Sequence, residues 1–202
     1  MPLYRSDIEQ NTPEWIAIKV GKFSASSADS LLMDKKTKGY QDLIEKIIEE
    51  RITGLPTESK WSGNQYTERG TEYEPIAADD FELNTFIKPE IIGVVELDDW
   101  TLCSPDRLIG DTGLLQIKCP IFKTQREYLK NPKVPGNYYK QMQFELFVSE
   151  RDYNIFYSYH PNLPAVEIRV ERDEQMIAEI KERLEQAKQE VIHEIEFLKS
   201  LK

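Results

Sequence analysis

The sequence predicts a mixed α/β (α+β) domain that spans residues 1–202 and ends in a long helix. Apolar residues recur at helical spacing through much of the first 85 residues, short β-rich runs follow, and helices and strands then alternate. No repeat or low-complexity segment divides the chain, and 40% apolar residues are enough to form a core. We therefore expect one domain.

Four helices are predicted in the N-terminal part of the chain. Thr12 followed by Pro13 is typical of a helix N-cap and first helical position, and Ser24 is a candidate cap for a second helix. Residues 40–53 and 69–83 each carry apolar side chains at three- and four-residue spacing. Both of these segments are predicted to be amphipathic helices.

The segment from Thr85 to Lys118 has short β-rich runs in place of the helical period. The runs FIKPEIIGVVEL, WTLCS and LLQIKC are separated by the turn signals DD and GDTG. This pattern predicts an antiparallel meander with Asp106 and Lys118 near strand ends.

The C-terminal part predicts two helices, a pair of strands and a final helix. Helices are expected at residues 125–130 and 138–148, and strands at 151–160 and 165–171. The final helix, 173–202, carries one apolar stripe, made of Ile177, Ile180, Leu184, Ala187, Val191, Ile195 and Leu198. The stripe would also suit a coiled coil, but we expect it to pack on the domain.

Composition excludes several classes of protein. Two cysteines, Cys103 and Cys119, are too few for a disulfide framework, an iron-sulfur cluster or a four-cysteine zinc site. No apolar run suits a signal peptide or a membrane span, so we expect a soluble intracellular protein. The net charge of −10 does not exclude DNA, because a cleft can be locally basic and bound metal ions add positive charge.

The stretch SPDRLIGDTGLLQIKCP carries residues suited to metal-assisted chemistry. Asp106, the amide oxygen of Gln116 and the carbonyl oxygen of Ile117 are oxygen donors of the kind Mg²⁺ prefers. Gln116 and Lys118 project to one face of a strand, so an ammonium would lie beside the metal and could orient a water. Taken alone, the spacing is more typical of solvated polar residues at strand ends.

The same stretch resembles the SPDGL and LELKCP segments of the phage lambda exonuclease family of PD-(D/E)XK-type nucleases. WIAIKVGKFSASSA is similar to the family's N-terminal W-x3-R-x-G-x2-T-A-S segment, and RGTEYEP to its G-x2-YE helix. YYKQMQFELFVSERDYNIFYSYHP resembles its glutamine-rich helix and following strand. The four segments occur in matching order and cover most of the chain.

The resemblance implies a PD-(D/E)XK nuclease-like fold, with a central mixed β-sheet flanked by helices. It implies a 5'-to-3' exonuclease acting on double-stranded DNA ends in phage-type recombination, with two Mg²⁺ ions per active site and Mn²⁺ as a substitute. It also implies a ring-shaped homotrimer, a phage single-strand annealing protein as partner, and the cytoplasm of a bacterial host cell.

The resemblance also assigns the residues of the site. Asp106 and Glu74 match metal ligands, joined by Gln116 and the Ile117 carbonyl, and Lys118 matches the active-site lysine. The family has Glu where this chain has Gln116. An amide keeps one oxygen acceptor and removes a negative charge, so metal affinity should fall.

Four further residues are implied to bind DNA. Lys19, Ser26 and Ser104 match the groups that hold the 5'-terminal phosphate, and Gln143 matches a glutamine near the active site. The family has Arg at the position of Lys19, and Lys replaces a bidentate fork with a point charge.

Gln116 leaves three explanations open. The chain is a natural active variant, or the residue was changed to trap substrate, or cleavage is lost and the chain only binds DNA ends. A separate hypothesis makes it a helix-mediated interaction protein that uses the stripe from Ile177 to Leu198 and has no role on nucleic acid.

Overall fold

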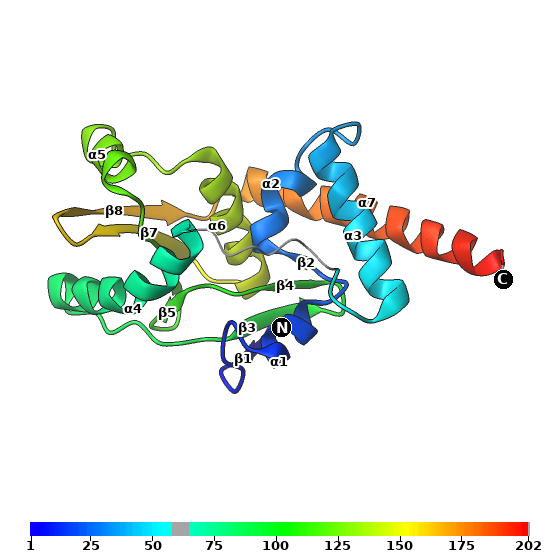
Figure 1. Ribbon diagram of the computed structural model, residues 1–202, viewed down its shortest axis with the longest axis horizontal. Coiled ribbons are helices and arrows are strands. Elements are labelled where there is room, and N and C mark those ends of the chain that lie inside the picture. The colour runs from blue at the N-terminus through cyan, green and yellow to red at the C-terminus, as the bar shows by residue number, and fades with distance from the viewer. Residues whose placement is uncertain (58–64, 202) are drawn as a thin grey trace.

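Two mixed β-sheets of four strands each form the centre of the molecule, and helices cover them (Figure 1). This computed structural model describes residues 1–57 and 65–201. The mixed α/β class expected from the sequence is confirmed, and its strands are divided between two sheets. Helix α7, Glu174–Ser200, extends away from the sheets and carries the C-terminus at its far end (Figure 1).

The first sheet is made by β1 (Leu3–Arg5), β2 (Phe23–Ser24), β3 (Val94–Asp98) and β4 (Thr101–Cys103), in the order β1-β3-β4-β2. β3 is antiparallel to β1 and β4, and β2 is parallel to β4. The parallel pairing places the chain that follows α1 directly beside β4. Ser24 is therefore the last residue of a strand and lies next to Leu102.

The second sheet has the order β5-β6-β7-β8, with strands Arg107–Ile109, Gly113–Lys118, Tyr153–His160 and Leu163–Glu171. β6 and β7 are parallel, and the other pairs are antiparallel. The meander predicted for residues 85–118 is therefore split, because the chain leaves the first sheet after Cys103 and starts the second at Arg107. The sequence pattern of strands and turns is the same for two consecutive antiparallel pairs whether they lie in one sheet or in two.

The N-terminal helices begin at capping residues. α1 (Pro13–Lys19) starts after Thr12, whose side chain accepts a hydrogen bond from Trp15 N–H, as predicted. The second helix predicted after Ser24 begins as a 3₁₀ turn, Ala25–Ser27, and continues as the short α2, Ala28–Leu31.

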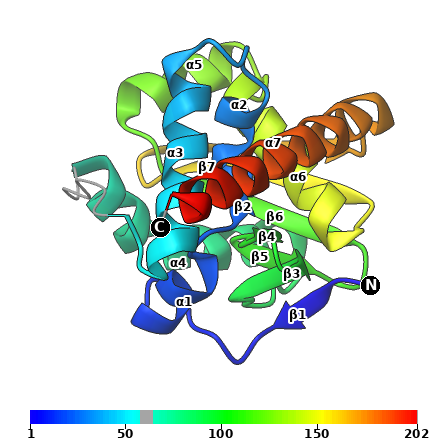
Figure 2. The same cartoon turned by 90° about the vertical axis from the view of Figure 1, so that its right-hand side faces the viewer.

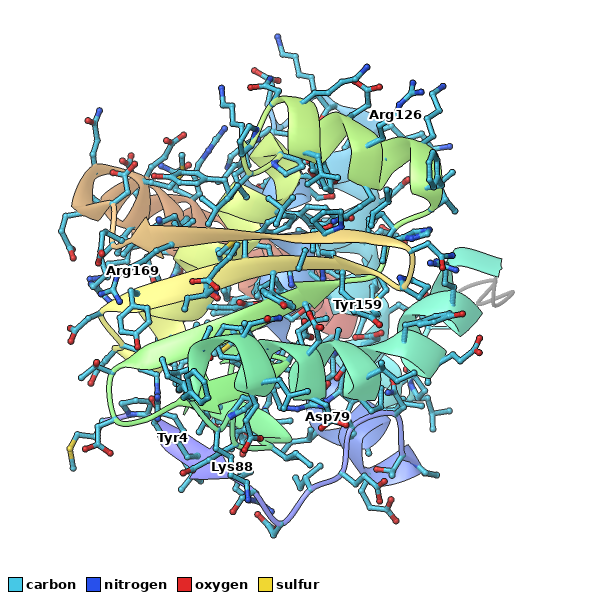
Figure 3. All side chains as sticks on the ribbon, turned by 90° about the vertical axis from the view of Figure 1, so that its left-hand side faces the viewer. Tyr4, Asp79, Lys88, Arg126, Tyr159 and Arg169 are labelled. Atoms are coloured by element: carbon cyan, nitrogen blue, oxygen red, sulfur yellow. The ribbon has the colours of Figure 1, made fainter. Side chains whose placement is uncertain are left out.

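The two longer N-terminal helices follow the predicted apolar periods. α3 (Lys38–Thr53) ends at Gly54, which has the left-handed conformation (φ 68°) that favours glycine. α4 (Gln65–Thr85) contains Pro75 and packs Ala77, Ala78 and Phe81 on the second sheet. Figure 3 shows this helix lying along the sheet, with Asp79 labelled on it and Tyr159 of β7 beside it.

Helices α5 (Phe122–Lys130) and α6 (Gly136–Ser149) form the crossover that the parallel β6–β7 pair requires. α6 contacts β3 and β4 of the first sheet and β7 of the second, and α7 packs on it (Figure 2). Most of its residues from Met142 to Ser149 are buried. α6 is therefore the helix that joins the two sheets, and three of its polar side chains, Gln143, Glu145 and Ser149, are buried.

The apolar stripe of α7 packs on the domain, as the sequence analysis expected. Five of its members are buried: Ile177, Ile180, Leu184, Ala187 and Val191. The helix contacts α2, α3 and α6, and Asp173 caps its first turn by accepting from Met176 N–H. Within the described residues no helix is long and apolar enough to cross a bilayer.

Candidate active site

A cavity of about 510 Å³ opens where the two sheets meet, at the end of β6 and the start of β5. Its lining comes from five separate parts of the chain: the α1–β2 region, α4, the β4–β5 connection, the stretch from the end of β6 into α5, and α6. The structure brings together most of the predicted site residues here, namely Lys19, Ser26, Glu74, Ser104, Asp106, Ile117 and Lys118. Two others, Gln116 and Gln143, do not line it.

Asp106 is fixed at the start of β5 by two hydrogen bonds to one oxygen. Its Oδ2 accepts from the backbone N–H of Ile117 and from the side-chain amide of Gln116, each at 2.6 Å. Both donors belong to β6, the strand that pairs with β5. The carboxylate is therefore tied to the strand that carries Lys118, and both residues line the same cavity.

Gln116 lies behind the cavity and is 1% exposed. Its Nε2 donates to Asp106, and its Oε1 accepts from Gln141 Nε2 at 2.9 Å. We expected the amide oxygen of Gln116 to be a metal ligand, but in the structure this oxygen does not face the cavity. The oxygen is turned to α6, because the N–H group is the part of an amide that a carboxylate attracts. Gln116 here supports Asp106.

Glu74 reaches the cavity from α4 and forms an ion pair. Arg107 Nη1 lies 2.7 Å from its Oε1 and also donates to the backbone carbonyl of Asp106, at 2.5 Å. Burial raises the pKa of Glu74, and the negative charge of Asp106 raises it further, against the opposing effects of Arg107 and Lys118. Two carboxylates thus repel each other across the cavity.

A third carboxylate, Glu145 of α6, lines the cavity and was missed by the sequence analysis. The side chain is fully buried and accepts hydrogen bonds from Gln141 Nε2 at 2.9 Å and Asn154 Nδ2 at 2.8 Å. Burial, and then repulsion by Asp106, raises its pKa to about 8. The four-residue spacing of Gln141 and Glu145 on a helix face was the signal that could have found it.

Gln143 points away from this cavity, so its prediction as a DNA-binding residue is corrected. Its amide donates to the carbonyl of Glu171 and accepts from Asp173 N–H, both at 2.8 Å. These bonds join α6 to the connection between β8 and α7. Two residues turn a helix by about 200°, so Gln141, two positions earlier, is the glutamine that faces the cavity.

Lys118 is the last residue of β6 and lies on the strand face that Gln116 shares. Leu115 and Ile117 pack in the cluster under α4, so the alternate side chains face α6. The ammonium lies 5.1 Å from the ring centroid of Tyr138 at the start of α6. A cation therefore stands at the cavity wall opposite α4, in the field of three carboxylates.

The phosphate-binding candidates lie on the part of the cavity formed by α1 and β2. Lys19 Nζ lies 3.5 Å from the ring centroid of Trp15, and the Trp15 indole N–H donates to Ser104 Oγ at 3.1 Å. The hydroxyls of Ser24 and Ser26 are 3.1 Å apart. Burial, followed by repulsion from Lys46, lowers the pKa of Lys19 to about 8, although Glu50 opposes this.

The chemical nature of the lining fits a hard divalent cation. Carboxylates from α4, α6 and the start of β5 meet the carbonyl-bearing end of β6, and all of these donors are oxygens. As the side chains lie, no group of three or more His, Cys, Asp or Glu among the described residues is close enough to hold an ion. Glu74 in particular is held by Arg107.

Comparisons with known proteins agree with this arrangement. Solved structures of an alkaline exonuclease (LHK-Exo) from Laribacter hongkongensis, one of them in complex with dAMP, are 34% identical in sequence. The match covers 94% of this chain and 97% of that chain, with a TM-score of 0.85. A phage related exonuclease from Haemophilus somnus 129PT has the same fold at 15% identity, with 90% and 96% coverage and a TM-score of 0.66. No curated protein matches the chain.

The family match covers the cavity lining except Gln10 and Asn11. Residues 14–152 match the family described as the YqaJ-like viral recombinase domain. This range contains α1 with Lys19, the β5–β6 hairpin, and α6 with Glu145. The chain belongs to the family of YqaJ-like viral recombinase domains.

Proposed function

We propose that the chain is a metal-dependent exonuclease that degrades double-stranded DNA in the 5'-to-3' direction during phage-type homologous recombination. One observation carries the proposal. A single cavity is lined by carboxylates suited to bind metal ions, by a lysine at a strand end, and by a lysine and two serines suited to bind a phosphate. The similarity to an alkaline exonuclease, one structure of which contains dAMP, supports the same reaction class. The whole chain would act as one nuclease domain.

The carboxylates of Asp106 and Glu74 and the carbonyl of Ile117 would hold two Mg²⁺ ions, or Mn²⁺ in their place. The ions, when bound, polarise the scissile phosphate and make water more acidic. Lys118 orients the attacking water and stabilises the charge that develops on the phosphoryl oxygens. The Ile117 and Gln116 donors hold Asp106 in position, and Glu74, now paired with Arg107, would have to leave this ion pair to hold a cation.

The 5'-terminal phosphate would bind at the other end of the cavity. Lys19 supplies a positive charge, and the hydroxyls of Ser26 and Ser104 supply hydrogen-bond donors. Trp15 holds both Lys19 and Ser104, through its ring face and its indole N–H. One aromatic side chain thus positions two of the three proposed phosphate-binding residues.

The protein would act as a homotrimeric ring in the bacterial cytoplasm and pass single strands to a phage annealing protein. Self-association is supported by large apolar side chains exposed on α4 and the segment after it, among them Leu83, Phe86 and Ile91. The hypothesis of a helix-mediated interaction protein loses its motivating surface, because most of the α7 stripe is buried in the chain's own core.

A protein that binds DNA ends without cleaving them is the second candidate. It is favoured by Gln116, which puts a neutral amide where the family has a carboxylate. It predicts end-dependent binding with no nucleotide release in Mg²⁺ or Mn²⁺.

Asp106→Asn should lower nuclease activity by about 100-fold or more, since the family's central metal-binding group loses its charge. The amide keeps an oxygen for the two β6 donors, so folding should be retained. Release of nucleotides from 5'-phosphorylated linear duplex is the measurement, with closed circular DNA as a substrate control. Asp111→Asn, an exposed position in the β5–β6 turn, is the matched variant and should be fully active. Full activity of Asp106→Asn would remove Asp106 from the metal site.

Preference for 5'-phosphorylated over unphosphorylated ends should decline above pH 8. Lys19 is charged below its pKa of about 8, and each further pH unit lowers the charged fraction about tenfold. The ratio of kcat/KM for the two substrates across pH 7 to 10 measures this. Lys19→Arg stays charged and should keep its preference to higher pH. A parallel pH profile for both proteins would contradict the role of Lys19.

Gln116→Glu should destabilise the metal-free protein by about 2 kcal/mol or more, because a donor to Asp106 becomes a like charge. Added Mn²⁺ should restore thermal stability, with modest change in nuclease rate if the natural chain is active. A rate gain of orders of magnitude would show that glutamine disables the site. Gln125→Glu is the control: Gln125 is equally buried but bonded to Ser158 and Pro164 outside the cavity, so metal should not rescue it.

The proposed ring should give a solution mass of three times the 23.6 kDa chain mass, measured by light scattering after size-exclusion chromatography. Phe86→Glu, at an exposed position, should shift the mass toward the monomer if this segment forms the contact. A monomer at all concentrations would contradict the trimer.

A further inference from the structure

Helix α6 places one carboxylate in the interior without a direct ion pair to a described residue. Glu145 is fully buried, and its hydrogen bonds come from two neutral amides, Gln141 and Asn154. No ion pair to it is found within the described part of the chain. A buried carboxylate with only amide donors is costly, so this position calls for a role beyond packing.

The position of Glu145 relative to Gln116 indicates that role. One nitrogen, Gln141 Nε2, donates to Gln116 Oε1 and to Glu145 Oε1, at 2.9 Å in both cases. The two oxygens therefore lie side by side on a shared donor. The acid on α6 and the amide on β6 approach the same region, the first from the helix and the second from the strand, but only Glu145 lines the cavity.

The groups around Glu145 hold its side chain in place. Asn154 of β7 donates to its Oε2, while the Asn154 Oδ1 is buried and has no hydrogen-bond partner among the described residues. A flip of this amide would present an acceptor in place of a donor. The two amides therefore fix the position of the Glu145 carboxylate from α6 and from β7.

We propose that Glu145 supplies the carboxylate that Gln116 lacks, as the third acidic metal ligand of the site with Asp106 and Glu74. The total charge offered to the cations is then the same as in a site with glutamate on the strand. Gln116 takes a different task, which is to hold Asp106 through its N–H and to accept from Gln141. The inference rests on the proposed metal-dependent function.

A swap of the two residues tests the assignment. Mn²⁺ binding to the DNA-free protein is measured by isothermal titration calorimetry, and nucleotide release is measured separately on linear duplex. Glu145→Gln should weaken Mn²⁺ binding at least tenfold and lower cleavage about 100-fold. The double variant Gln116→Glu with Glu145→Gln should recover most of both, because the carboxylate returns to the same region from the strand.

Two controls separate ligation from a structural role. Glu50→Gln removes the charge of another buried glutamate. Glu50 accepts a hydrogen bond from Gly21 N–H and does not line the cavity, so Mn²⁺ affinity should not change. Thermal unfolding identifies any variant that fails to fold, and the swap variant then carries the test. Unchanged Mn²⁺ affinity in folded Glu145→Gln, or a folded swap variant that binds no Mn²⁺, would overturn the proposal.

The two proposals fail in different ways. If the natural chain binds Mn²⁺ through Glu145 but releases no nucleotides, the exonuclease function fails and the ligand assignment stands. If it degrades linear duplex and Glu145→Gln does so at the same rate and with the same Mn²⁺ affinity, the function stands and the assignment fails.

Discussion

The paired hydrogen bonds from β6 to Asp106 Oδ2 are the constraint on which the site depends. They connect the residue that begins β5 to the backbone and side chain of the strand that ends in Lys118. The hairpin register, with Arg107 opposite Leu115, keeps the two strand ends together. Without this link the carboxylate would be free to rotate into solvent, and neither the ammonium nor the Ile117 carbonyl would have a fixed relation to it.

The second requirement is a helix that tolerates polar groups in the interior. α6 is buried between the two sheets and α7, yet it carries Gln141, Gln143 and Glu145. Each of these side chains has hydrogen-bond partners from another element: β6, the β8–α7 connection and β7 respectively. Such a network is stabilising only when all its members have hydrogen-bond partners at once. The helix can therefore meet this condition only in its observed position between β6, β7 and the β8–α7 connection.

Much of the fold could be predicted from local sequence patterns, and most of the site from the resemblance of four segments to a nuclease family. Helix boundaries followed caps such as Thr12 and stops such as Gly54, and the cavity collects seven of the nine predicted site residues. The division into two sheets could not be predicted, since strand alternation does not record which strands share a ladder.

The errors on α6 have a related physical cause. A buried helix lacks the polar face that tells which side meets solvent, so Gln143 and Gln141 were indistinguishable by period alone. Glu145 was overlooked because its one sequence signal, the four-residue spacing from Gln141, does not show that this helix face lines a cavity. Only the packing of α6 against β6 and β7 shows that it faces an amide where an acid was expected.

The ion pair between Arg107 and Glu74 has a consequence for how the protein reaches its working form. The guanidinium is a built-in counterion for a carboxylate of α4, and it belongs to the first residue of β5. The scaffold assembles with the chain's own charges, because the carboxylate of Glu74 meets its compensating charge on Arg107. This differs from small domains whose fold forms only around a bound ion.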